Sequence, residues 1–269
     1  MAKNCPLLKD GKDRRGDKDT KHAAQARNTK RYGKNNEKEK KMAKFYSEKV
    51  SKSPRIDKLK ADLFKEMPQI EADRAVLLTE SYMQTEGEPI ILRRAKAFEN
   101  ILDKIPITIR DDELIVGSAT KRPRSCQTFP EFSFEWLENE FDTVATRTAD
   151  PFYISEETKK TLHEVYKYWK GKTTSELATS YMSPETLTAM KHNMFTPGNY
   201  FYNGIGHVTV DYGKVLTYGY SKYIEEVKDE LASMRVSDGN YCKKRAFLDA
   251  VLISLKAVIR YAKRYARLA

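Results

Sequence analysis

Residues 195–212 hold the side chains best suited to binding chemistry. This stretch of eighteen residues crowds aromatics, three glycines, a histidine and an acid between two helical patterns. Irregular loops of this kind place side chains at a site rather than fill a core. Asp211 would accept a hydrogen bond from a hydroxyl group, while Tyr200 and Tyr202 would offer aromatic faces to an organic cation. We expect these three residues to form one wall of a substrate pocket.

The same stretch also allows plainer interpretations. Asp211 precedes a predicted helix, so its alternative role is to cap that helix. His207 follows two glycines, and it either makes a structural hydrogen bond or belongs to the site. Gly204 and Gly206 do not complete a dinucleotide-binding GxGxxG motif, because position 209 is threonine. The four histidines never pair with each other or with cysteine at metal-ligand spacing, so no metal site is predicted.

The positive charge of the chain is concentrated near its N-terminus. The whole chain has a net charge of +11, but residues 1–60 contain 20 basic and 8 acidic residues, a net of +12. The remaining residues, with 29 basic and 30 acidic groups, are nearly neutral. We therefore predict a basic disordered tail over residues 1–52 and a folded body over 53–269. A polybasic arm for nucleic acid and a docking peptide are the alternatives for the tail.

The sequence shows no pattern for secretion, membrane insertion or disulfide formation. The most apolar run, residues 251–259, is too short to span a bilayer and contains Lys256. Cys5, Cys126 and Cys242 are too far apart in the sequence to form a disulfide framework or a metal site. We expect a reducing, cytoplasmic compartment and no membrane partner.

Hydrophobic periodicity predicts a mostly helical body. The expected helices cover residues 55–67, 71–84, 89–105, 135–141, 155–169, a segment from 183, 216–234 and 238–269. Alternating isoleucines at 105–109 and the apolar run 114–117 predict a short hairpin or a pair of buried strands. The last helical stripe is still regular at the final residue, so we expect a truncated chain with uncovered apolar helix faces.

Several runs resemble the N-terminal third of glycyl radical enzymes of the pyruvate formate-lyase-like family. These runs are residues 71–80, 112–117 and 206–212. Two further runs, 126–136 and 196–212, closely resemble the members that cleave choline to trimethylamine and acetaldehyde. The resemblance covers about residues 53–269. It implies an α/β fold class, mostly helical in this portion, as the N-terminal part of a ten-stranded α/β barrel.

The resemblance also implies an anaerobic carbon–nitrogen lyase that uses an organic radical and no bound cofactor. A glycyl radical, installed by an activating enzyme that uses S-adenosylmethionine, would oxidise a cysteine to a thiyl radical. The thiyl radical would take hydrogen from C1 of choline, and a glutamate would act as base on the hydroxyl. The implied protein is a homodimer when full length, in the cytoplasm or inside a bacterial microcompartment.

The motifs for that chemistry are absent from the chain. Neither the family's Gly-Cys-x-Glu loop nor its Arg-Val-x-Gly-Tyr glycyl loop occurs in the sequence. We expect no catalytic residue in this chain and a fragment that is inactive alone, because these groups would lie beyond residue 269. A dehydratase for hydroxyproline or a diol is the alternative within the family. A complete basic helical interaction protein or nucleic-acid-binding protein is the alternative from another class.

We expect limited digestion with trypsin to leave a core that starts near Ser53, because the composition of residues 1–50 cannot offset the entropy of ordering them. Mass spectrometry of the digest checks this, and the heat-unfolded chain, cleaved throughout, is the control. Protection at Arg14, Arg15 and Arg27 would instead show a docked tail.

Overall fold

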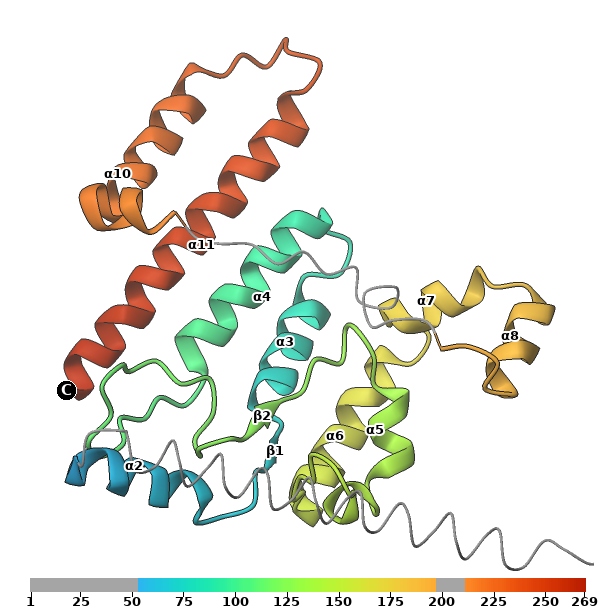
Figure 1. The fold of residues 1–269 in the computed structure, drawn as a ribbon. Helices are drawn as coiled ribbons and strands as arrows, with labels where there is room; N and C mark the ends of the chain where they lie inside the picture. Colours follow the sequence, from blue (N-terminus) through green and yellow to red (C-terminus); the bar gives the residue numbers. More distant parts are fainter. Residues whose placement is uncertain (1–52, 197–210) are drawn as a thin grey trace, which may run out of the picture. The chain divides into compact units, whose positions relative to one another are not determined.

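The computed structural model of the chain describes residues 53–196 and 211–269, which are mostly helical (Figure 1). Two compact units divide the chain, Met1–Asp57 and Lys58–Ala269. The expected boundary between residues 52 and 53 stays a prediction. The helices are α2 (Pro54–Phe64), α3 (Asp73–Gln84), α4 (Ile90–Lys104), α5 (Glu135–Glu140), α6 (Glu156–Trp169), α7 (Thr174–Ser180), α8 (Pro184–Lys191), α10 (Tyr212–Ser233) and α11 (Tyr241–Leu268), with a 3-10 turn η1 (Val144–Thr146).

Side-chain caps mark the starts of several helices. Ser155 caps α6, where its Oγ accepts a hydrogen bond from the Thr158 amide at 3.1 Å, as the sequence predicted. Ser183 caps α8 in the same way. Helix α7 was not predicted from the sequence, although Thr173 and Glu176 form a capping box at its first turn. The predicted start of the last helix at residue 238 was early, because α11 begins at Tyr241.

A small parallel sheet joins segments that are far apart in the sequence. Strand β1 (Ile70–Glu71) pairs with β2 (Cys126–Gln127), and Ile70 lies opposite Cys126. On the other side of β1, the Ile70 amide donates to the Tyr153 carbonyl at 2.9 Å. Three chain segments therefore meet at β1, and α3 begins directly after it.

The main core of the second unit lies where α3, α5 and α6 meet. Phe134 and Tyr166 stack with ring centroids 4.8 Å apart, and both side chains are buried. The indole Nε1–H of buried Trp169 donates to Thr79 Oγ1 at 2.8 Å. Burial of these aromatic rings is the main favourable contribution at this junction, and the hydrogen bond satisfies the one polar atom of the indole.

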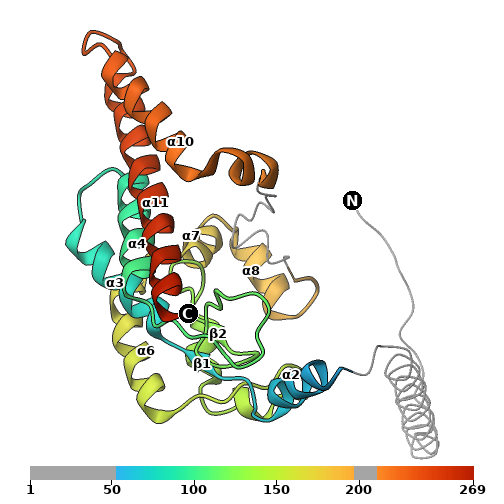
Figure 2. The same ribbon diagram turned by 90° about the vertical axis from the view of Figure 1, so that its left-hand side faces the viewer.

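Helix α4 packs between α3 and α11, and α10 packs on α11 (Figure 2). Arg264 of α11 donates to the carbonyl oxygens of Leu102 and Ile105, at 2.5 and 2.7 Å. These carbonyls lie at the C-terminal end of α4, where no intrahelical donor remains, so the guanidinium both caps α4 and fixes α11 against it. The expectation that the α11 stripe lies uncovered was wrong for several of its residues, since Leu248, Ala257 and Tyr265 are buried.

The predicted strands within residues 105–117 are absent from the described residues. This segment is irregular after Ile105, and Leu114, Ile115 and Val116 are 68, 86 and 45% exposed. Alternating apolar residues form strands only where a partner strand can accept their backbone hydrogen bonds. In the described part of the chain that pairing is made by β1 and β2 instead.

We expect Thr79→Val to lower the free energy of unfolding by about 1–3 kcal/mol, because the buried Trp169 N–H would lose its acceptor. Urea unfolding monitored by tryptophan fluorescence checks this. The matched control is Thr188→Val, since the exposed Thr188 hydroxyl bonds only to the Pro184 carbonyl of its own helix. The control should change stability by less than about 0.5 kcal/mol, and equal losses in both variants would contradict a special role for Thr79.

Candidate functional site

Asp211 is the one predicted pocket residue that the structure describes. It lies before α10, where its Oδ1 accepts a hydrogen bond from the Lys214 amide at 3.1 Å. Its other oxygen, Oδ2, lies 4.0 Å from the Lys214 ammonium, and 64% of the side chain is exposed. The capping role expected as the alternative is thus present, and it occupies only one of the two carboxylate oxygens.

Tyr200, Tyr202 and His207 lie outside the described residues. Their predicted place beside Asp211 therefore stays a prediction. Phe195 and Tyr212, which flank this segment, are 46 and 66% exposed. In the described part of the chain, the candidate pocket is represented by Asp211 alone.

Arg74 joins two of the runs that carry the family resemblance, 71–80 and 126–136. Its guanidinium binds both oxygens of Glu131, at 2.5 and 3.1 Å, and lies 3.9 Å above the ring of Phe129. It also donates to the Thr128 carbonyl at 3.3 Å. Paired donors of this fork geometry give a carboxylate one orientation. The run 71–80 therefore holds the run 126–136 in a fixed position.

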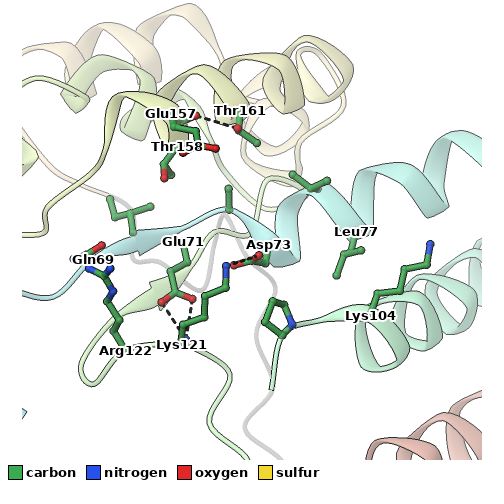
Figure 3. Close-up of a pocket in the computed structure, with 14 residues that line it drawn as sticks. Gln69, Glu71, Asp73, Leu77, Lys104, Lys121, Arg122, Glu157, Thr158 and Thr161 are labelled. Carbon is green, nitrogen blue, oxygen red and sulfur yellow. Dashed lines mark hydrogen bonds and ion pairs between the residues drawn. The ribbon is translucent and has the colours of Figure 1, made fainter. Parts of the chain in front are cut away.

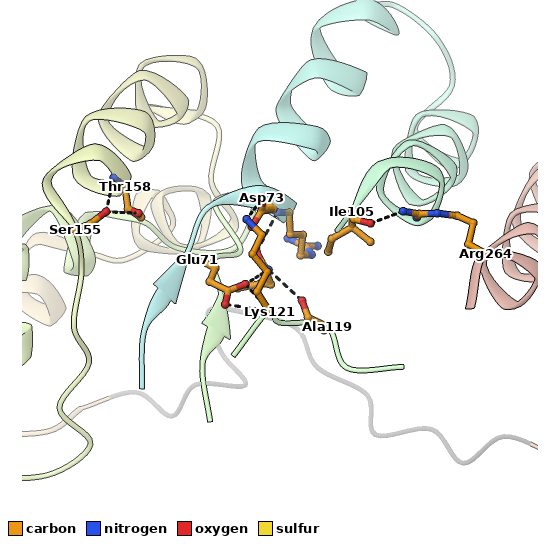
Figure 4. Close-up of polar contacts among 10 residues, drawn as sticks. Glu71, Asp73, Ile105, Ala119, Lys121, Ser155, Thr158 and Arg264 are labelled. Atoms are coloured by element: carbon orange, nitrogen blue, oxygen red, sulfur yellow. Dashed lines mark hydrogen bonds and ion pairs between the residues drawn. The ribbon is translucent and has the colours of Figure 1, made fainter. Parts of the chain in front are cut away.

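A second polar junction forms around Glu71, whose carboxylate is 9% exposed (Figure 4). Both of its oxygens accept from the Lys121 amide at 3.1 Å, and Oε2 also accepts from Gln127 Nε2 at 3.0 Å. The side-chain Oε1 of Gln127 accepts in turn from the Arg74 backbone amide at 3.0 Å. Because buried polar groups are costly unless paired, this network fixes the register of β1 and β2.

A hollow of about 530 Å³ lies beside this junction (Figure 3). Glu71 and Lys121 line one side, and Glu157 and Thr158 of α6 line another. The Lys121 ammonium is already paired with Asp73 at 2.9 Å. The other two basic side chains of the lining, Lys104 and Arg122, lie 3.8 and 3.6 Å from Glu80 and Glu66 respectively. Among the described residues that line this hollow, each basic side chain therefore already lies beside a carboxylate.

Glu135 anchors the end of the second run. Burial alone would raise the pKa of this carboxyl, but hydrogen bonds from its own amide, Thr173, Phe134 and Ser133 outweigh burial and lower the pKa. Thr173 Oγ1 donates at 2.8 Å. A depressed pKa means that the carboxylate stabilises the fold above its unfolded pKa and that this contribution is lost as the pH falls. Glu135 is therefore a structural anion that connects the starts of α5 and α7.

The described residues hold no group of three or more His, Cys, Asp or Glu side chains placed to bind a metal ion. Nor does any helix in that part of the chain have the length and apolar character needed to cross a membrane. Cys126 is half-buried, and burial followed by the charge of Glu71 raises the pKa of its thiol. A raised pKa disfavours the reactive thiolate.

A family model described as pyruvate formate lyase-like matches residues 24–269. The chain belongs to this family. Its mostly helical α/β structure matches the N-terminal part of the glycyl radical enzyme fold, as the resemblance implied. The match begins at residue 24, inside the segment predicted as a tail.

Two solved structures are notably similar to this chain. One, described as 1,2-propanediol dehydration in Roseburia inulinivorans, is 61% identical with a TM-score of 0.76, over 81% of this chain and 28% of the other. The glycerol-bound B12-independent glycerol dehydratase from Clostridium butyricum is 55% identical with a TM-score of 0.74, at the same coverages. The (2S)-3-sulfopropanediol dehydratase of Klebsiella oxytoca is 33% identical, over 80% of this chain and 27% of the relative. The chain thus spans about a quarter of the length of these relatives.

The contact between the runs 71–80 and 126–136 was not predicted from the sequence. A partial signal was present, since Arg74 stands in the first turn of a helix and Glu131 follows a proline. Local patterns do not reveal a pairing across 57 residues, because separation in the sequence does not limit approach in space. The structure brings these two runs together.

We expect Arg74→Met to lower the free energy of unfolding by about 2–3 kcal/mol, because Glu131, whose side chain is 17% exposed, would lose its bidentate partner. Lys167→Met is the matched control, since the Lys167–Glu164 pair is 71% exposed on both sides and should contribute less than about 0.5 kcal/mol. Urea unfolding of both variants checks the difference. Equal stabilities would show that the Arg74–Glu131 pair does not hold the two runs together.

Proposed function

We propose that the chain supplies the N-terminal part of a glycyl radical dehydratase for a small vicinal diol, such as propane-1,2-diol or glycerol. The supporting observation is the level of identity, which reaches 61 and 55% with the two structures associated with these diols and 33% with the sulfopropanediol dehydratase. A dehydratase for a diol was one of the alternatives within the family that the sequence left open. Loss of water from such a diol yields an aldehyde.

Choline is the second candidate substrate. It rests on the resemblance of runs 126–136 and 196–212 to choline-cleaving members of the family. Choline and a vicinal diol share one feature, a hydroxyl group on the carbon next to the one that loses its substituent. A carboxylate that accepts this hydroxyl would suit both substrates, whereas aromatic faces would favour the ammonium group of choline.

Asp211 is our candidate for the group that binds the hydroxyl. The α10 cap uses its Oδ1, so Oδ2 can accept a second hydrogen bond without uncapping the helix. We also propose that Tyr200 and Tyr202 belong to the same wall of the pocket as Asp211. The proposal also includes activation by an enzyme that uses S-adenosylmethionine. It further includes a homodimeric full-length protein, located in the cytoplasm or in a microcompartment. The cysteine and glycine loops must come from polypeptide outside this sequence.

A comparison of three substrates tests the proposal. The full-length polypeptide that carries this sequence is activated without oxygen by a radical-generating enzyme and S-adenosylmethionine, then offered propane-1,2-diol, glycerol and choline separately. We expect aldehyde from a diol and no trimethylamine from choline. Trimethylamine as the main product would favour choline. A glycyl radical signal without any of these products would overturn both substrates and leave the family assignment intact.

In that enzyme, Asp211→Asn should lower kcat/KM for the preferred substrate by roughly 10- to 100-fold, because a charge-assisted hydrogen bond becomes a neutral one. Thermal stability should hardly change, because asparagine caps a helix about as well as aspartate. Asp211→Ala is the matched variant that removes cap and charge together. Unchanged kinetics in Asp211→Asn, measured beside its melting curve, would leave Asp211 with the capping role alone.

A further inference from the structure

Helix α10 is interrupted at Gly219. The backbone there has φ 66° and ψ 171°, a combination that is essentially restricted to glycine. A residue with these angles breaks the ladder of hydrogen bonds between residues four apart. The helix therefore consists of two parts, residues 212–218 and 220–233, which run in different directions (Figure 2).

The two parts of α10 differ in how they are packed. After the break, Tyr223 and Val227 are half-buried in the part of the chain where α10 packs on α11. Before the break, Tyr212, Leu216 and Tyr218 are 66, 84 and 61% exposed. Apart from Val215, which is half-buried, the described apolar side chains of the first part are exposed, so packing holds the second part more firmly than the first. The direction of residues 212–218 depends mainly on the backbone at Gly219.

We propose that Gly219 is a hinge on which residues 211–218 turn as one unit relative to the rest of α10 and to α11. The unit is internally rigid, because Asp211 caps it through the Lys214 amide and Thr217 Oγ1 donates to the Gly213 carbonyl at 2.7 Å. Its two states are the bent helix seen here and a continuous helix. A continuous helix regains the hydrogen bonds lost at the break, while glycine is a poor helix former, so these effects oppose each other. The hinge sets the direction of the Asp211 carboxylate, whatever substrate the enzyme takes.

A distance measurement across the break tests the hinge. Spin labels go on cysteines at exposed positions 214 and 228, in a Cys5→Ser, Cys126→Ala, Cys242→Ser background of the full 269-residue chain. In a continuous helix these positions are 14 residues, or about 21 Å, apart along the axis. The ruler keeps native Cys242 in a Cys5→Ser, Cys126→Ala background and adds Lys256→Cys. This is an equally spaced exposed pair in α11, whose helix shows no break.

We expect the native pair across Gly219 to give a shorter and broader distance distribution than the ruler pair in α11. Gly219→Ala should shift it to the ruler value, because alanine disfavours the backbone angles of the bend. In the bent state its Cβ would meet nothing within 4 Å, so the effect comes from the backbone and not from a clash. Gly213→Ala is the matched control, as it adds the same methyl group in the same helix without altering the break. A native distribution equal to the ruler, or no shift in Gly219→Ala, would overturn the hinge. An equal shift in Gly213→Ala would assign the effect to helix propensity and overturn it as well.

Discussion

The arrangement of the core depends most on the contacts of the Arg74 guanidinium. It approaches Glu131 with two donors and Phe129 with its flat face. Both partners belong to a loop without regular structure, which hydrophobic packing alone would leave free to slide. Because the guanidinium is planar, it accepts one orientation of the carboxylate and one of the ring. Lysine could replace the charge at this position but not the geometry.

The polar junction also explains how so small a sheet persists. Two residues per strand give β1 and β2 few backbone hydrogen bonds, too few to be stable alone. Glu71 and Gln127, directly opposite each other in the sheet, add a side-chain hydrogen bond and are both nearly buried. If the register slipped by one residue, these polar groups would be buried without hydrogen-bond partners, and the free energy of unfolding would fall.

The sequence predicted the helices better than it predicted how they meet. Helix α6 was predictable at both ends, because Ser155 caps it and Gly171, with φ 78°, follows it. These signals act over one turn, where sequence and structure coincide. The run Leu114–Val116 misled for the opposite reason, since a strand exists only with a partner, and partners are not encoded locally. The same limit applies to the candidate site, where Asp211 was predictable as a cap and the link from Arg74 to Glu131 was not.

A chain can be rich in ionisable groups and still offer few for chemistry. Glu71, Arg74 and Glu135 are each bound to several protein partners, so a substrate would have to displace bonds that hold the fold. A group that serves both fold and substrate must keep one polar atom unused by the first. Asp211 meets this requirement in part, because its cap takes Oδ1 and, among the described residues, its Oδ2 makes only a 4.0 Å ion pair with the exposed Lys214 ammonium. It also lies at the start of the part of α10 whose side chains are mostly exposed. The two regions therefore have different roles. The junction around Arg74 fixes the positions of the core segments, whereas the turns after Asp211, which make few packing contacts, present its carboxylate.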